Sequence, residues 1–361
     1  ENPLSEYIVA LLGDEVVGYA GIWNPGDQAH ITNIVTNSIK YTPESGNIKV
    51  YVGAVHDDAY IKIIDNGMDF EGIAKIGDMV VFVPGAIAGE EVKIHIIKVN
   101  TSYAIGKVIE IIKQDSERVQ PPCITYKRCG GCSGLHVSYT KTLDMKYNNV
   151  VNTIKKAGLD TSVIESIYGM GVPYNYRNKV QYPVAPDENG KCVFGYYARH
   201  SHRIVKHSTC PLQDEIFTDI ARYIVDRANL MGISPYDETK GIGILRHIVM
   251  RKNRLGEILL CLVARKRDLK LNSLAKSVSE RFGNIIGVHL NINKQQDNVI
   301  FGEETYCLLG EETLKDTLCG KTFELSPRAF YQVNAIMAEK LYEKAAEYAE
   351  PEGKTVIDLY C

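Results

Sequence analysis

The sequence lacks the features that direct a chain into or across a membrane. No run approaches the ~20 consecutive apolar residues that span a bilayer. The first residues also lack the basic segment and apolar core of a signal peptide. We therefore expect a cytoplasmic protein, which we also take to be monomeric, and its length suggests two or three domains.

An excess of positive charge is also missing, since the formal net charge is −3 at pH 7. That charge is unevenly distributed along the chain. Residues 1–67 carry nine acidic and three basic side chains, a net charge of −6, so the remainder carries +3. The positive charge of the remainder is compatible with a nucleic-acid partner, although the total charge argues against one.

The first 67 residues contain two short segments that resemble parts of other families. Tyr7–Leu12 and Val16–Trp23 are apolar runs around a turn, which predicts a hairpin. Residues 1–34 resemble the central hairpin of ribosomal-protein-alanine acetyltransferases. Residues 33–67, with Asp65-Asn66-Gly67 near their end, resemble part of a histidine-kinase ATPase domain. Because the glycine-rich loops of both families are missing, we expect neither activity and treat a stitched reading frame as a hypothesis.

A series of short β runs separated by glycine turns follows. The runs are Gly72–Ile76, Val80–Pro84, Glu91–Val99 and Ala104–Ile112. They predict a small five-stranded barrel of the OB type. The run FEGIAKIGDMVVFVPGAIAGEEVKIHI resembles a TRAM domain, which implies an RNA-binding barrel over residues 68–115.

Three cysteines come next in the spacing C-x5-C-x2-C. They are Cys123, Cys129 and Cys132, and Cys210 in HSTCPLQ is a fourth candidate. Clustered cysteines in a cytosolic chain indicate a metal site or catalysis rather than disulfides. Four thiolates complete either a tetrahedral zinc site or an iron–sulfur cluster. A three-cysteine loop with a distant fourth cysteine is more typical of a [4Fe–4S] cluster.

The segment PPCITYKRCGGCSGLHVSYTKTLDMK closely resembles the cluster-binding segment of TRAM-containing iron–sulfur RNA (uracil-5-)-methyltransferases of the 23S rRNA type. The resemblance extends over about residues 68–361. It implies that Cys123, Cys129, Cys132 and Cys210 bind a [4Fe–4S] cluster. The cysteines at 192, 261, 307 and 319 are then ordinary apolar side chains.

Residues 174–206 are rich in basic and aromatic side chains. The segment contains six basic and two acidic side chains, a net charge of +4, with six aromatic residues among them. In single-stranded RNA binding, basic side chains contact the phosphates and aromatic rings stack on the unpaired bases. Tyrosines that alternate on a strand are, however, more often core residues. The resemblance implies that this segment holds RNA, and we expect Arg177, Lys179 and Arg199 to contact it.

The rest of the central region predicts a mixture of strands and helices. Residues 245–263 and 285–300 read as strands, and Ser273–Phe282 and Met337–Tyr348 read as helices. An α+β central domain over residues 116–320, containing the cysteine loop, follows from this mixture. We expect His200, His202 and His207 to be solvent-exposed structural histidines.

The last segment resembles the start of a methyltransferase domain, which we place at residues 321–361. In FELSPRAFYQVN, the resemblance implies that Gln332 contacts S-adenosylmethionine. Thr355–Cys361 reads as the first strand of a doubly wound α/β domain, and Tyr360 is the second expected cofactor contact. The family's nucleophilic cysteine and general base lie beyond the position of Cys361. We therefore expect no catalytic residue here and an inactive chain.

Together these patterns predict an α+β multidomain protein that binds RNA, S-adenosylmethionine and a [4Fe–4S] cluster. The function expected from the resemblance is methylation of uracil C5 in rRNA, with tRNA as the other substrate left open. The alternative is a non-catalytic iron–sulfur protein that binds RNA.

Overall fold

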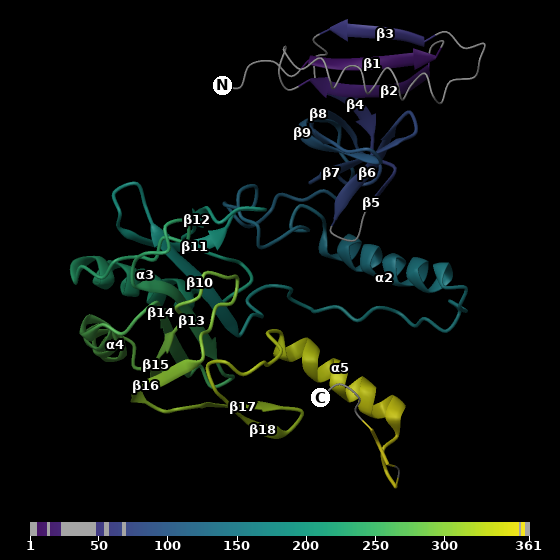
Figure 1. Cartoon of the computed structure of the whole chain (residues 1–361). Coiled ribbons are helices and arrows are strands. Elements are labelled where there is room, and N and C mark those ends of the chain that lie inside the picture. Colours follow the sequence, from purple (N-terminus) through teal and green to yellow (C-terminus); the bar gives the residue numbers. More distant parts are fainter. Residues whose placement is uncertain are drawn as a thin grey trace. The chain divides into compact units, whose positions relative to one another are not determined.

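The computed structural model describes residues 6–12, 15–22, 48–53, 58–66, 70–353 and 355–357. The chain forms two compact units (Figure 1). The barrel unit contains residues 1–119 and 136–165, and the sheet unit contains residues 120–135 and 166–361. Within the described residues, none of the helices is both long and apolar enough to cross a membrane.

The barrel unit is built on a six-stranded sheet in the order β4-β8-β9-β7-β6-β5. Each of the strands β6 to β9 has two buried residues that alternate with more exposed ones, as the glycine-separated runs predict. The strands are β4 (Asp58–Lys62), β5 (Asp65–Asn66), β6 (Glu71–Ile76), β7 (Met79–Pro84), β8 (Glu91–Val99) and β9 (Tyr103–Lys113).

The barrel sheet begins earlier than the sequence predicts. Strand β4 pairs antiparallel with β8, and β5 pairs with β6. Ile63, between them, is 1% exposed and packs with Val81, Val92 and Ile94 in the barrel core. Residues 58–66 therefore complete the barrel sheet, although the sequence analysis assigned them to the ATPase-like segment.

Three strands before the barrel form a separate antiparallel sheet in the order β2-β1-β3. The hairpin of β1 (Glu6–Leu12) and β2 (Glu15–Ile22) is the expected one. Strand β3 (Ile48–Gly53) pairs with β1, so the acetyltransferase-like and ATPase-like segments contribute to one sheet. Residues 33–43 lie outside the described residues.

A buried ion pair fixes the chain that leaves the barrel. Both carboxylate oxygens of Glu90, which is 0% exposed, accept hydrogen bonds from Arg118, at 2.6 Å from Nε and 2.7 Å from Nη2. Arg118 Nη2 also donates to the carbonyl of Gly85 at 2.7 Å. Glu90 further accepts the backbone N–H of Ile87 at 2.9 Å. Each charge in this pair therefore has several partners.

Helix α2 (Tyr139–Lys156) belongs to the barrel unit, although the sequence analysis placed its residues in the central domain. Ser138 caps it by accepting the Lys141 N–H at 3.1 Å. Its buried Met145 packs with Ile87 and Val137. These contacts explain why residues 136–165 group with the barrel.

The sheet unit contains a seven-stranded sheet in the order β12-β11-β10-β13-β14-β15-β16. All neighbouring strands are antiparallel except β14 and β15, which are parallel and joined through a helix. The strands are β10 (Lys179–Pro186), β11 (Cys192–Tyr197), β12 (Ile204–Lys206), β13 (Leu245–Lys252), β14 (Ile258–Ala264), β15 (Ile285–Ile292) and β16 (Glu304–Gly310).

Helices α3 (Glu215–Leu230) and α4 (Leu269–Arg281) pack against this sheet (Figure 1). The apolar side of α3, with Phe217, Ile220 and Ile224, is fully buried in the core. Helix α4 is the expected helix with an earlier start, whereas α3 was not predicted. The expected strand over residues 285–300 ends at Ile292.

The end of the sheet unit contains a hairpin of β17 (Leu314–Leu318) and β18 (Lys321–Leu325), followed by α5 (Ala335–Ala349). Helix α5 confirms the expected helix within two residues at its start. Asn334 caps it by accepting the Met337 N–H at 3.1 Å. Residues 355–357 have no regular structure, and the remainder of the strand expected over residues 355–361 lies outside the described residues.

Candidate functional site

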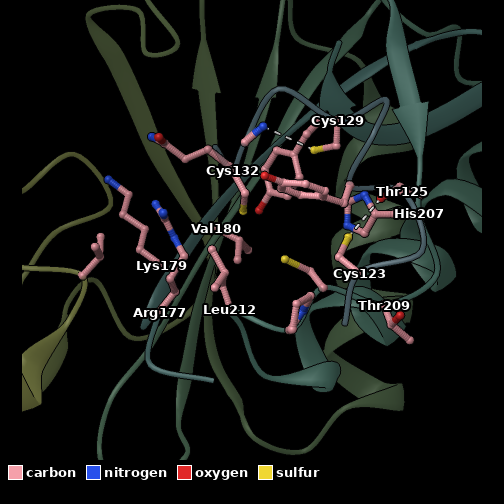
Figure 2. Close-up of a pocket in the computed structure, with 17 residues that line it drawn as sticks. Cys123, Thr125, Cys129, Cys132, Arg177, Lys179, Val180, His207, Thr209 and Leu212 are labelled. Carbon is pink, nitrogen blue, oxygen red and sulfur yellow. Dashed lines mark hydrogen bonds between the residues drawn. The ribbon is translucent and has the colours of Figure 1, made fainter. Parts of the chain in front are cut away.

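The four expected cysteines line one cavity of the sheet unit. Its volume is about 260 Å³. Cys123, Cys129 and Cys132 come from the loop 120–135 (Figure 2). Cys210 comes from the segment before α3. Residues about 80 positions apart in the sequence are therefore brought together as the spacing and the resemblance predict.

The cysteine loop is held by the end of strand β11. The Gly130 N–H donates to the carbonyl of Tyr197 at 2.8 Å, and Cys129 forms a β-bridge with Ala198. A Cβ at Gly130 would lie 2.9 Å from the same Tyr197 oxygen, so only glycine fits there without displacement. Arg199 Nη2 donates to the Cys132 carbonyl at 2.8 Å. Arg199, which we expect to contact RNA, thus also fixes the cysteine loop.

The cavity disfavours thiolates in the absence of a compensating charge. Burial, followed by the neighbouring Cys210, raises the pKa of Cys132 to about 12. Burial is also the main cause that raises the pKa values of Cys129 and Cys210. A bound cationic group reverses this effect, because metal ligation deprotonates thiols.

Four cysteine thiols are donors of the kind that bind either zinc or an iron–sulfur cluster. Within the described residues, no three His, Cys, Asp or Glu side chains are arranged to hold one metal ion. A tetrahedral zinc ion, with Zn–S bonds of ~2.3 Å, would draw its sulfur ligands to within about 4 Å of one another. Thiolates around a [4Fe–4S] cluster bind different irons and stay farther apart. Four thiols that surround one cavity are consistent with that arrangement.

The aromatic side chains beside the cavity are core residues. Tyr182 is 0% exposed, and Tyr196 stacks on His207 with ring centroids 5.1 Å apart. Gln213 donates to the Tyr182 hydroxyl and accepts from the Tyr196 hydroxyl. These tyrosines are therefore unavailable as a platform for bases. His207 is half-buried, which corrects the expectation that it is solvent-exposed.

Arg177 and Lys179 line the same cavity as the cysteines. Arg177 forms β-bridges with Gln213, three residues after Cys210, and with Asn334. The basic residues expected to contact RNA are therefore adjacent to the cysteine site. The sequence could not show this proximity, because it depends on contacts between distant segments.

Asn178 connects this basic segment to the expected cofactor segment. Its Nδ2 donates to the Gln332 carbonyl at 2.9 Å, and its backbone N–H donates to the Val333 carbonyl at 2.9 Å. Gln332 itself is half-buried. Tyr360, the other expected cofactor contact, lies outside the described residues.

Three comparisons place the chain among known proteins. The TRAM domain family matches residues 52–109, which begins earlier than the expected residue 68 and includes β4 and β5. The comparisons give no support to the acetyltransferase-like and ATPase-like assignments.

The similar curated proteins are RNA methyltransferases described as uncharacterized. One from Clostridium acetobutylicum is 41% identical over 312 residues, which is 85% of this chain and 68% of the relative. One from Clostridium tetani is 39% identical over 298 residues, which is 82% of this chain and 65% of the relative. One from Staphylococcus epidermidis is 36% identical over 304 residues, 83% of this chain and 67% of the relative. The chain thus spans about two thirds of their length.

A similar solved structure is that of the Pyrococcus abyssi tRNA (uracil-54, C5)-methyltransferase in complex with S-adenosyl-L-homocysteine. The TM-score is 0.59 at 19% sequence identity, over 80% of this chain and 64% of that one. At this level of identity the likeness shows a shared fold.

Proposed function

Because the chain belongs to the RNA methyltransferase family of these relatives, we propose that it serves in the methylation of uracil C5 in RNA, with S-adenosylmethionine as methyl donor. The fold shared with the tRNA (uracil-54, C5)-methyltransferase supports C5 of uracil as the target atom. The TRAM match supports an RNA substrate.

The observation that carries the proposal is the composition of a single cavity. Four cysteines, Arg177 and Lys179 surround it, although they come from three separate segments. We propose that Cys123, Cys129, Cys132 and Cys210 hold a [4Fe–4S] cluster. When bound, the cluster would cross-link the loop 120–135 to the segment before α3 and so fix the surface beside it.

The RNA contacts in this proposal are Arg177, Lys179 and Arg199. Arg177 and Lys179 line the cavity, and Arg199 is an exposed side chain that holds the cysteine loop. Guanidinium and ammonium groups suit phosphates, and an ordered loop lowers the entropic cost of binding. We assign rRNA as the substrate, with tRNA as the outcome that would replace it.

The cofactor contacts in this proposal are Gln332 and Tyr360. Asn178 supports the first of them, because two hydrogen bonds hold the backbone of Gln332 and Val333 in place. A fixed backbone orients the Gln332 side chain before the cofactor binds.

Methylation at C5 requires two further groups. Uracil C5 is a weak nucleophile, so a thiolate must add to C6 and a base must later remove the C5 proton. The target base must also leave its stack to be reached. We assign neither the thiolate nor the base to a described residue. The expectation that this chain is inactive gains no support from the comparisons, which match it to methyltransferases generally.

The direct test incubates the protein with labelled S-adenosylmethionine and either an unmodified 23S rRNA fragment or a tRNA transcript. Digestion to nucleosides then reveals the product. We expect 5-methyluridine in the rRNA. Product in tRNA alone would show that tRNA and not rRNA is the substrate. Product in neither RNA would contradict the proposed activity.

Iron and sulfide analysis tests the cysteine assignment separately. After anaerobic reconstitution, we expect about four irons for each chain, because the proposed cluster contains four. Cys132→Ser should lower that content sharply, whereas Cys307→Ser, an exposed cysteine away from the cavity, should leave it unchanged.

A further inference from the structure

Two basic side chains face each other on neighbouring strands of the sheet unit. Lys179 on β10 is the direct antiparallel partner of Arg251 on β13. Side chains directly opposite in such a pair lie on the same face, with Cβ atoms about 5 Å apart. Like charges in this position destabilise a sheet. Their juxtaposition therefore needs a compensating reason.

Arg251 is buried with part of its guanidinium unsatisfied. It is 4% exposed, and its Nη2 donates to the Ala329 carbonyl at 2.7 Å. Its Nε and Nη1 are buried without any hydrogen-bond partner. Asp316 influences the Arg251 pKa, but its Oδ1 accepts the backbone N–H groups of Arg254 and Thr317. Buried donors without partners cost free energy.

Lys179 is half-buried and has no carboxylate partner among the described residues. Its Nζ lies 5.7 Å from the centroid of the Phe301 ring. Burial, followed by the charge of Arg251, lowers the pKa of Lys179 to about 8. The ammonium group thus meets both desolvation and repulsion in a place that lines the cavity.

Another buried arginine in the same unit is arranged differently. Arg246 is 1% exposed, and its Nη1 donates to the carbonyls of Asn293 and Gln295 at 2.9 and 2.7 Å. Its Nη2 lies 3.6 Å from a Glu238 carboxylate oxygen. Arg246 has a carboxylate beside it, although its Nε and Nη2 also lack hydrogen-bond partners. Within the described residues, neither Lys179 nor Arg251 forms an ion pair with a carboxylate.

We propose that the Lys179–Arg251 pair is a binding site for a phosphate group. The inference rests on the proposed function, in which that phosphate belongs to the backbone of the bound RNA. One oxyanion between the two cations would satisfy the free N–H donors and cancel the repulsion. Guanidinium groups match phosphate oxygens through parallel hydrogen bonds, and an ammonium group adds a point charge. Lys179 is the more accessible member, because it is only half-buried whereas Arg251 is 4% exposed.

The first experiment uses the unaltered protein and the reactivity of its lysines. Acetylation of each lysine is followed by mass spectrometry with no ligand, with inorganic phosphate, with an unmodified rRNA fragment and with S-adenosylhomocysteine. At ten times the dissociation constant, a bound phosphate should slow acetylation of Lys179 about 10-fold. Lys276, an exposed lysine on α4 of the same unit, serves as the internal control.

The second experiment compares Lys179→Met, Arg251→Met and the control Lys276→Met. Phosphate should raise the melting temperature of the unaltered protein and of the control. The two pair variants should lose that increment, and each should bind RNA about 10-fold more weakly. Arg251→Lys, which keeps the charge, should retain part of the increment.

The outcomes separate this inference from the proposed function. Absence of protection by both phosphate and RNA would overturn the inference. Protection of Lys179 by S-adenosylhomocysteine alone would also overturn the inference. RNA binding that is unchanged in both pair variants would overturn it as well, but would leave the RNA-binding function in place. Protection by phosphate in a protein that binds no RNA would support the phosphate site and overturn its assignment to RNA.

Discussion

Arg118 in the barrel unit and Arg251 in the sheet unit are both largely removed from solvent, but their surroundings are opposite. Arg118 binds both oxygens of Glu90 and a backbone carbonyl. Arg251 faces Lys179 and leaves two N–H donors without partners. A buried charge with all partners present stabilises a fold. A buried charge with unpaired donors costs free energy, and at Arg251 we propose that a phosphate supplies the partner.

The largest expected effect comes from breaking the complete pair. Arg118→Met leaves the fully buried Glu90 carboxylate without its main partner, which typically costs about 3–5 kcal/mol. Urea unfolding should show a loss of that size. The double variant Glu90→Leu/Arg118→Met removes both charges and should recover most of the stability. A loss below about 1 kcal/mol in the single variant would contradict the assigned role of the pair.

A smaller loss is expected where the cysteine loop meets β11. Gly130→Ala places a Cβ 2.9 Å from the Tyr197 carbonyl oxygen, and such overpacking costs about 1–3 kcal/mol. Iron bound after reconstitution should fall with it. Gly131→Ala is the matched control, because its Cβ would meet Cys129 Sγ at 3.5 Å, an ordinary contact. Equal iron content in both variants would argue against the loop geometry.

Replacing Arg251 by methionine should change the stability far less than the same replacement of Arg118. Arg251→Met removes a buried charge that repels Lys179, so the free energy of unfolding should change by about 1 kcal/mol or less, or even rise. Urea unfolding of the two Arg→Met variants compares them directly. A loss as large as that of Arg118→Met would show that Arg251 is a structural residue and not an incomplete binding site.

The smallest effect concerns the pH dependence of stability. The pKa of Lys179 is about 8 in the folded chain and ~10.4 in an unfolded one. Between these values the unfolded state binds more protons, so stability should rise with pH from about 8 to about 10. Below about 8 the full penalty is present. The difference in unfolding free energy between the unaltered protein and Lys179→Met should show this slope, which Lys276→Met should not alter.

The sequence predicted the elements whose signal is local. Glycine turns between alternating runs indicated β6 to β9, and cysteine spacing indicated the residues that surround the cavity. Helix α3 also carried a usable signal, because Phe217, Ile220 and Ile224 follow a helical period. Helix α2 carried a weaker one, since Thr142 and Met145 are its buried residues.

The remainder depends on pairing that a single sequence does not display. Lys179 and Arg251 become neighbours through the register of β10 and β13. Asn178 meets Gln332 across 154 positions of sequence. Strand β4 agrees with the strand that the sequence predicts at Tyr60–Ile64, but the ATPase-like assignment of that strand was wrong, because β4 pairs with β8 of the barrel sheet.

The measurement that tests the account most directly is the salt dependence of binding to an unmodified rRNA fragment. Each phosphate contact that is lost lowers the slope of log Kd against log salt by about 1. We expect Lys179→Met to show that decrease and Lys276→Met to match the unaltered protein. Identical slopes in all three proteins would contradict the assignment of Lys179 and its unpaired neighbour Arg251 to the RNA backbone.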